Sequence, residues 1–197
     1  MSFIGMAQVK PGVETLRDGG FAQLKGKRVG LITNPSGVDN NLKSTIDILS
    51  EAKGVKLVAL YSPEHGVRGD IYAGAKVDTY VDAKTGVTVY SLYGKNKKPS
   101  KEMLKDVDVL IYDIQDNGCR SFTFISTMGL CMEACAENGK EFMVLDRPNP
   151  LSGLKVEGNL VEEGFFSLVS QFEIPYLYGL TPGELALMLN DGMLKDG

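Results

Sequence analysis

The sequence lacks several features that would assign it to a common class of protein. No apolar run is long enough to cross a membrane, and residues 1–10 do not combine a basic stretch with an apolar one, so no signal peptide is visible. Net positive charge is also missing, since the formal charge is −4. We therefore expect no membrane span and no nucleic-acid partner, because a general nucleic-acid surface requires a basic stripe.

Cysteine is scarce, and the common nucleotide-binding motifs are absent. The three cysteines cannot all pair within the chain; Cys131 and Cys135 have helical i,i+4 spacing and are interpreted as small buried hydrophobic residues. Cys119 has no His at a useful spacing, which argues against a cysteine nucleophile. The first predicted strand is followed by Asn34-Pro35-Ser36-Gly37 instead of Gly-x-Gly-x-x-Gly, which disfavours dinucleotide binding.

Apolar runs and amphipathic segments alternate along the chain. Strands are predicted over 27–33, 55–61, 107–114 and 141–145, and helices over 45–52, 100–105, 123–138 and 181–189. One or two helical turns are expected within 9–26, a hairpin or excursion beside the sheet within 71–98, and a further strand or extended segment over 156–161. This order predicts an α/β fold with a Rossmann-like, doubly wound, mainly parallel sheet.

The loop after the second predicted strand concentrates ionisable side chains. Glu64, the single histidine His65, Arg68 and Asp70 follow Ser62-Pro63 and are interleaved with glycines. Ligands of open parallel sheets bind outside the carboxyl ends of the strands, so this loop is the first candidate for chemistry. Burial against apolar neighbours raises the pKa of a carboxyl group toward that of a general acid, and Glu64 is our candidate for that role.

Polar residues also follow the other predicted strands, and all these ends should share one edge of the sheet. A rim with several carboxylates suits glycoside hydrolysis, in which one carboxyl protonates the leaving oxygen and another acts as base, nucleophile or charge stabiliser. The same rim suits a divalent cation. Structural roles stay open: Asp113 accepting backbone N–H groups in its turn, or Asp146 forming an ion pair with Arg147. The rim residues are Asn34, Asp113, Gln115, Asp116, Asp146, Arg147 and Asn149.

Three of these strand ends resemble signatures of the bacterial exo-β-N-acetylmuramidase family. They are Ser62-Pro63-Glu64-His65-Gly66-x-Arg68-Gly69, Asp113-Ile114-Gln115-Asp116-x-Gly118-x-Arg120 and Leu145-Asp146-Arg147-Pro148-Asn149-Pro150. Segments 29–35, 89–94 and 156–158 are similar to the family as well, so the resemblance runs from about residue 27 to the end. It implies removal of β-1,4-linked N-acetylmuramic acid from the non-reducing end of peptidoglycan fragments, with muropeptides or related saccharides as partners and no cofactor.

The resemblance also implies roles for individual residues. Glu64 is the expected general acid, and Glu157 or Asp116 is the second catalytic group unless the substrate's own N-acetyl group assists. An arginine binds a carboxylate through two parallel hydrogen bonds, which suits the lactyl carboxylate of muramic acid. The expected substrate-binding residues are Asn34, His65, Arg68, Asp113, Gln115, Arg120, Arg147 and Asn149, and no metal ligand is among them.

The implied organisation is a Rossmann-like catalytic domain followed by a second α/β domain, with the active site between them. We expect a helical segment packing on the sheet over 1–26, the catalytic domain over 27–160, and a connection leading into a truncated second domain over 161–197. Members of the family act on cell-wall material, which implies export.

Two other functions stay open at this stage. A metal-dependent hydrolase would use Asp113, Asp116, Glu64 and His65 as ligands and bases. A non-catalytic module would bind muropeptides without turnover.

Overall fold

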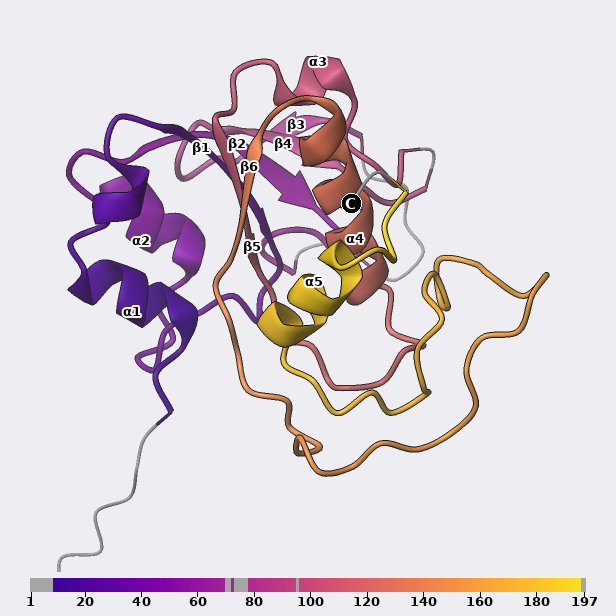
Figure 1. Cartoon of the computed structure of the whole chain (residues 1–197). Coiled ribbons are helices and arrows are strands. Elements are labelled where there is room, and N and C mark those ends of the chain that lie inside the picture. Colours follow the sequence, from indigo (N-terminus) through magenta and orange to yellow (C-terminus); the bar gives the residue numbers. More distant parts are fainter. Residues whose placement is uncertain (1–8, 70–71, 73–77, 95, 196–197) are drawn as a thin grey trace, which may run out of the picture.

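A six-stranded sheet forms the centre of the molecule, in the strand order β3-β4-β2-β1-β5-β6 (Figure 1). The computed structural model describes residues 9–69, 72, 78–94 and 96–195; Asp70, Lys95 and part of the predicted 71–98 excursion lie outside them. The strands are β1 (Arg28–Thr33), β2 (Lys56–Ser62), β3 (Tyr80–Val81), β4 (Thr88–Ser91), β5 (Val109–Asp113) and β6 (Glu141–Val144). Only the β3–β4 pair of this sheet is antiparallel, which confirms the predicted α/β class.

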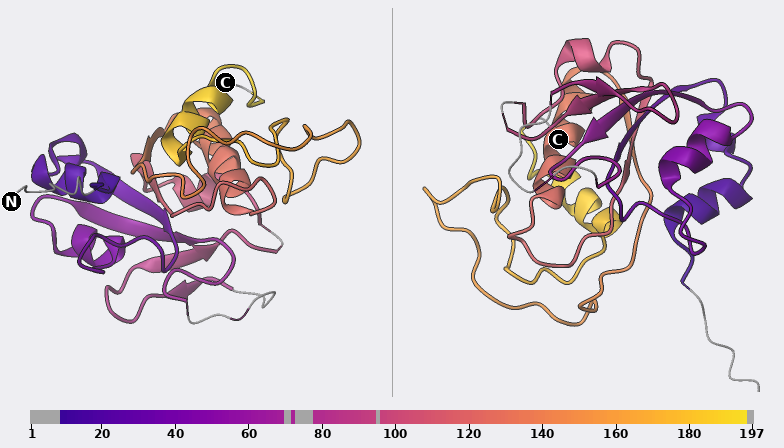
Figure 2. Two further views of the ribbon diagram at one scale, coloured as in Figure 1. Left: turned by 90° about the horizontal axis from the view of Figure 1, so that it is seen from below. Right: turned by 180° about the vertical axis from the view of Figure 1, so that it is seen from behind.

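Helices cover both faces of the sheet, as expected for a doubly wound fold (Figure 1; Figure 2, right). On one face lie α1 and α2, and on the other lie α4 and α5. The bounds are α1 (Gly12–Asp18), α2 (Thr45–Glu51), α3 (Lys101–Leu104), α4 (Phe124–Glu137) and α5 (Pro182–Asn190). No helix in the described ranges has the length and apolar character needed to cross a bilayer.

Local sequence signals explain where the helices begin and end. Ser44 caps α2 by accepting a hydrogen bond from the Asp47 backbone N–H at 3.1 Å. Thr181 and Glu184 form a capping box at the start of α5. Gly139 follows α4 with a φ of +60°, a conformation that favours glycine. The helices predicted over 45–52, 123–138 and 181–189 are therefore confirmed, with ends that differ by at most one residue.

The expected hairpin is β3–β4, and its second strand is an integral part of the sheet. β4 lies between β3 and β2 and pairs with β2 in parallel, so the segment extends the sheet instead of standing beside it. The run 107–114 therefore holds the fourth parallel strand of the chain and not the third. Residues 156–161 form no strand: Glu157 makes one isolated bridge with Leu177, and the chain bends at Gly158, which has a φ of +87°.

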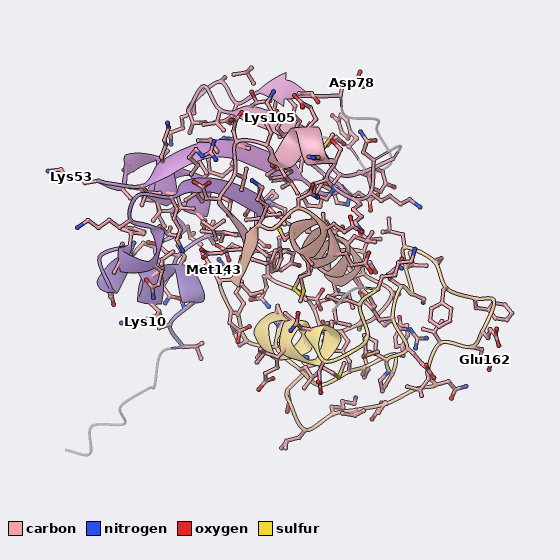
Figure 3. The ribbon with its side chains drawn as sticks, turned by 45° about the horizontal axis from the view of Figure 1, so that its top comes forward. Lys10, Lys53, Asp78, Lys105, Met143 and Glu162 are labelled. Atoms are coloured by element: carbon pink, nitrogen blue, oxygen red, sulfur yellow. The ribbon has the colours of Figure 1, made fainter. Side chains whose placement is uncertain are left out.

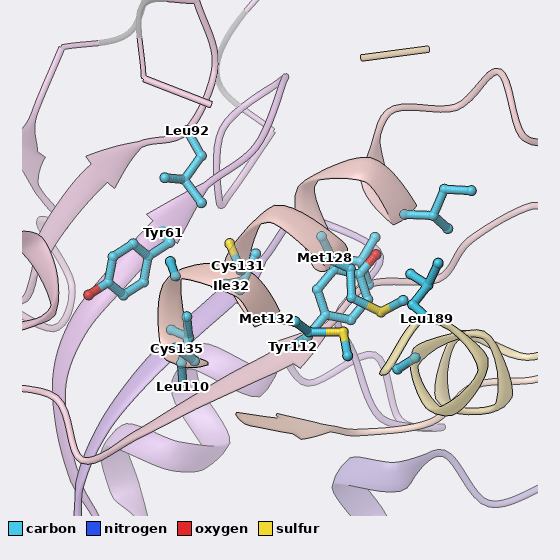
Figure 4. Packing of buried hydrophobic residues seen from close by; sticks show 14 of the residues in the cluster. Ile32, Tyr61, Leu92, Leu110, Tyr112, Met128, Cys131, Met132, Cys135 and Leu189 are labelled. Atoms are coloured by element: carbon cyan, nitrogen blue, oxygen red, sulfur yellow. The ribbon is translucent and has the colours of Figure 1, made fainter. Parts of the chain in front are cut away.

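Two hydrophobic clusters hold the layers together, one on each face of the sheet. The strands are apolar on both faces, which is typical of buried parallel strands. Figure 4 shows the cluster beneath α4, in which Tyr112 and Met128 lie toward Leu189 of α5 and Tyr61 lies toward Leu92. Residues of α5 thus share a core with the sheet; the predicted division at residue 160 stays a prediction.

Cys131 and Cys135 lie in the same cluster and are buried, as expected. Burial raises the pKa of the Cys131 thiol well above its usual value and that of Cys135 to about 12. Neither thiol is therefore ionised near neutral pH.

A long segment without helix or strand connects β6 to α5. It loops away below the sheet in the view of Figure 1, and Figure 3 shows Glu162 at its outer end. Its large apolar side chains are unusually exposed: Leu154 is 97% and Phe165 73% accessible.

Candidate functional site

The carboxyl ends of the parallel strands meet along one edge of the sheet. The parallel register aligns Thr33 with Asp113 and Ser62 with Ser91 at that edge. The loops that follow these positions carry the residues singled out in the sequence. The expectation that these strand ends share one edge is therefore confirmed.

Glu64 lies in the tight turn that follows β2. The turn is closed by a hydrogen bond of 3.4 Å from the Gly66 N–H to the Pro63 carbonyl, and His65 has a φ of +75°. Glu64 is half-buried and His65 is exposed. The Glu64 carboxylate raises the pKa of the Tyr93 hydroxyl, which places the two groups near each other. Glu64 is thus accessible and lies near a tyrosine hydroxyl.

Sequence reasoning missed Tyr93 as a member of this site. The sequence signal that could have found it is its position: Tyr93 lies two residues beyond the end of β4, just as Glu64 lies two residues beyond the end of β2. Only the pairing of β4 with β2 makes these two ends neighbours.

Arg68 ties the Glu64 loop to the body of the protein. Its Nε lies 2.6 Å from Asp82 Oδ1, and its Nη2 lies 3.0 Å from Asp82 Oδ2 and 3.1 Å from Asp47 Oδ1. Hydrogen bonding with the guanidinium lowers the pKa of Asp82 to about 2. Lys84 also contacts Asp47, at 2.6 Å. Both carboxylates occupy the guanidinium, so a direct contact of Arg68 with substrate stays a prediction.

Asp113 and Arg147 form a buried ion pair across the ends of β5 and β6. Arg147 Nε is 2.6 Å from Asp113 Oδ1, and Nη2 is 3.1 Å from Oδ2. The exposed fractions are 0% for Asp113 and 6% for Arg147. Thr45 donates a further hydrogen bond to Asp113, and Arg147 donates to the Val38 carbonyl at 2.9 Å. This pair connects β5 and β6 to α2 and to the loop after β1.

Asp146 does not pair with its neighbour Arg147, so that alternative is wrong. Its carboxylate instead accepts hydrogen bonds from Thr181 Oγ1 at 2.8 Å and from the Gly183 N–H at 2.7 Å. Both donors belong to the start of α5, where the helix dipole favours a negative charge. Adjacent side chains on an extended backbone point to opposite faces, and this separates Asp146 from Arg147.

Asn34, Gln115 and Asn149 stabilise the loops of this edge. Asn34 Oδ1 accepts from the Ser36 N–H at 2.9 Å. Gln115 Nε2 donates to the carbonyls of Asp116 and Pro148 at 2.7 and 2.8 Å. Asn149 donates to the Leu180 carbonyl at 3.0 Å. Their role in substrate binding stays a prediction.

Asp116 is buried behind the edge, with an exposed fraction of 2%. Its carboxylate accepts hydrogen bonds from the Tyr178 hydroxyl and, at 2.8 Å, from the Gly118 N–H. Burial raises the pKa of Asp116 and that of Tyr178. One oxygen, Oδ1, has no hydrogen-bond partner among the described residues. Asp116 thus anchors the long segment before α5 to the loop after β5.

Glu157 belongs to the long segment between β6 and α5, and Arg120, in the loop after β5, holds that segment. Arg120 Nη1 donates to the carbonyls of Asn159 and Ile174 at 2.7 and 2.5 Å, and its guanidinium lies 5.9 Å from the centre of the Tyr176 ring. Arg120 also lines a cavity of about 300 Å³. Glu157 is exposed, and its carboxylate lies 3.7 Å from Lys155 Nζ.

The structure gives no support to the metal-site alternative. Among the residues it describes, no group of three or more His, Cys, Asp or Glu side chains is arranged to hold a metal ion. Asp113 is occupied by Arg147, while Asp116 is buried with Tyr178.

Two larger cavities flank the edge strand β6 and do not include Glu64. One of about 600 Å³ lies between α1 and the residues after β6, and one of about 650 Å³ lies between α4, β6 and α5. Glu64 therefore lies outside both.

The fold and this edge define the class of the protein: a Rossmann-like α/β protein with an accessible carboxyl group where such sheets bind ligands. The family model described as exo-β-N-acetylmuramidase NamZ, N-terminal, matches residues 29–195. The chain belongs to this family, and the resemblance seen in the motifs is confirmed.

Characterised and solved relatives agree with this assignment. The chain is 56% identical over 183 residues to the peptidoglycan β-N-acetylmuramidase NamZ of Bacillus subtilis (strain 168), a match covering 93% of this chain and 44% of the relative. A crystal structure of a DUF1343 family protein from Bacteroides fragilis NCTC 9343 is 68% identical, with a TM-score of 0.89, covering 95% of this chain and 47% of that one. A second such protein is 39% identical, with a TM-score of 0.82, covering 96% and 49%. The chain spans about half the length of these relatives.

Proposed function

We propose that the protein containing this chain is an exo-acting glycoside hydrolase that removes β-1,4-linked N-acetylmuramic acid from the non-reducing end of peptidoglycan fragments. The 56% identity to a peptidoglycan β-N-acetylmuramidase, over 93% of this chain, carries the proposal. The substrates are then muropeptides or other saccharides with terminal N-acetylmuramic acid. Because peptidoglycan lies outside the cytoplasmic membrane, the substrate supports export of the protein.

Glu64 is the proposed general acid. Its accessible position at the ligand-binding edge supports this role, because a general acid must reach the glycosidic oxygen that it protonates. The proton moves from the Glu64 carboxyl to the leaving oxygen as the bond to the anomeric carbon breaks. A second group then stabilises the positive charge on the sugar or activates water.

Accessibility favours Glu157 over Asp116 as that second group. Glu157 is exposed, whereas Asp116 is buried and bound by Tyr178. The N-acetyl group of the substrate is the alternative to a protein carboxylate.

Among the arginines proposed for the lactyl carboxylate, Arg120 is favoured because it has no carboxylate partner within the described residues. Arg147 is occupied by Asp113 in the interior, and Arg68 by Asp82 and Asp47. Arg120 contacts main-chain carbonyls through Nη1 only and faces a cavity lined also by Phe165.

The test is release of the leaving group from a chromogenic β-N-acetylmuramide by the protein at its full natural length. The corresponding N-acetylglucosaminide serves as the substrate control. We expect turnover of the muramide alone, and a loss of about 10²–10⁴-fold in Glu64→Gln. Glu102→Gln is the matched control, since Glu102 is an exposed glutamate of α3 paired with Lys105.

Other outcomes would favour the other functions. Saturable binding of muropeptides without turnover would indicate a binding module. Turnover that a chelator abolishes would indicate a metal-dependent hydrolase. Full activity in Glu64→Gln would refute Glu64 as the general acid.

A further inference from the structure

Strand β6 lies at one edge of the sheet, and within the described residues it pairs with β5 alone. The Glu141 and Leu145 N–H groups donate to carbonyls on the β5 side, at 3.0 and 2.9 Å. Backbone N–H groups alternate in direction along a strand, so those of Phe142 and Val144 point away from β5. The outer side of β6 therefore presents backbone donors and acceptors on which a further strand can pair.

The central side chains of β6 are apolar but only half-buried, whereas all five residues of β5 are buried. Phe142 and Val144 pack against the cluster beneath α4, and Met143 packs against the cluster on the opposite face. Natural proteins cover or interrupt apolar edge strands, because such edges pair with other chains. This edge therefore calls for a cover that is apolar on both faces of the sheet.

The two larger cavities lie on opposite faces of β6 and have mainly apolar walls. Leu16 of α1, Met143 and Leu145 line the cavity of about 600 Å³. Phe142 and Leu187 line the cavity of about 650 Å³, and Leu187 is 75% exposed although it belongs to α5. Successive side chains of a strand point to opposite faces, so a single strand beside β6 fills both cavities.

The direction of α5 shows where the chain returns to the sheet. The first turn of α5 contacts Asp146, which lies beyond the carboxyl end of β6. Its last residue, Asn190, lines a cavity together with Lys140, which directly precedes β6. α5 therefore runs from the carboxyl ends of the strands back toward their amino ends, where a parallel strand begins.

The handedness of the fold then selects the edge. Connections between parallel strands of one sheet are right-handed in about 98% of cases. The connection from β5 through α4 leads to β6, one position further along the sheet. Because α5 covers the same face as α4 (Figure 1), a right-handed connection through α5 leads one position further again. That position is the outer side of β6.

Relatives of the chain have the residues that such a strand needs. The chain spans about half the length of these relatives, and the family model that it matches is an N-terminal one. Further residues therefore follow the part that corresponds to α5 in these relatives.

We propose that, in the protein at its full natural length, residues after position 197 form a seventh strand of the sheet, parallel to β6 and paired with its outer side. This strand is apolar on both faces and fills the two cavities. Its carboxyl end lies beside Asp146, so the loop that follows it joins the ligand-binding edge. The inference depends on the edge strand and the helices, and not on the proposed glycosidase function.

The first test is amide hydrogen exchange at single-residue resolution in the full-length protein. The Leu145 N–H is the internal control, because it is bonded on the β5 side. We expect the Phe142 and Val144 amides to exchange as slowly as that of Leu145, about 100-fold or more below the rate of unprotected amides. Exchange of both at the unprotected rate, with Leu145 protected, would refute the added strand. The readout needs no enzymatic activity.

The second test identifies what covers the edge. In Leu187→benzoylphenylalanine, illumination of the full-length protein cross-links position 187 to chain that reaches the cavity beside β6, and mass spectrometry identifies the peptide. We expect a peptide that follows position 197 in the same molecule. Lys53→benzoylphenylalanine is the matched control, because Lys53 is exposed ahead of β2, three strands away from β6, and should not capture that peptide. A cross-link to a second copy of the chain, together with a dimer in light scattering, would overturn the proposal.

Discussion

Carboxylates at the ends of β2 and β5 lie in opposite environments. Beyond β2, Glu64 is half-buried in a tight turn, near the neutral hydroxyl of Tyr93. At the end of β5, Asp113 is fully buried and paired with Arg147. Both positions follow a buried strand and share the ligand-binding edge. Their difference teaches that a place at a strand end does not decide the surroundings of a carboxylate, since one is neutralised by a cation in the interior and the other is accessible.

Asp113→Asn should have the largest effect on stability. It leaves the Arg147 guanidinium buried without its counter-charge, which costs about 3–5 kcal/mol. Urea unfolding of the 197-residue chain measures this loss. Asp106→Asn is the matched control, because Asp106 makes an exposed 3.2 Å contact with Arg28 that is worth at most about 1 kcal/mol. Equal losses in both variants would refute the importance of burial.

Asp116→Asn should change the pH dependence of stability. Burial raises the pKa of Asp116, so the folded state binds this proton more tightly than the unfolded state. The wild-type protein therefore loses stability as the pH rises from the unfolded-state value through the raised folded-state pKa. The variant lacks this titration, and its stability relative to wild type should rise over the same range. Unfolding series at several pH values would show the opposite trend if Asp116 were better solvated than it is here.

Arg68→Lys should lower the free energy of unfolding by a smaller amount, about 1 kcal/mol. The bidentate contact with Asp82 is lost, but the positive charge remains. The pKa of Asp82, lowered to about 2 by Arg68, should rise in the variant. Because the folded-state pKa of Asp82 is lowered, this carboxyl stabilises the protein at pH values above its unfolded-state pKa. That stability is lost as the pH falls toward 2. Acid unfolding should therefore begin at a higher pH in Arg68→Lys. Identical acid midpoints would contradict this reading of the network.

Glu64→Gln should change stability least, within about 0.5 kcal/mol. Glu64 is half-buried and makes no ion pair among the described residues, so the substitution leaves no buried charge unpaired. The same urea titration used for Asp113→Asn measures it. A loss of unfolding free energy as large as that of Asp113→Asn would contradict the difference proposed between the two strand ends.

Local chemistry alone predicts much of the fold. Buried parallel strands appear as short apolar runs, the cap at Ser44 and the box at Thr181 mark two helix starts, and Gly139 marks a helix end. The family motifs lie at the strand ends because that is where a parallel sheet gathers its loops. Each of these features depends on neighbours within a few residues, so the sequence itself determines it.

The partners of the site residues depend on tertiary structure. Arg147 pairs with the distant Asp113 and not with the adjacent Asp146, and Glu64 meets Tyr93 because β4 pairs with β2. Strand order and side-chain direction are properties of the packed sheet, since they bring together residues far apart in the chain. The sequence thus determined which residues stand at the edge. Only packing decided which of them are neutralised in the interior and which stay open to a ligand, because burial and the nearest counter-charge are set by non-local contacts.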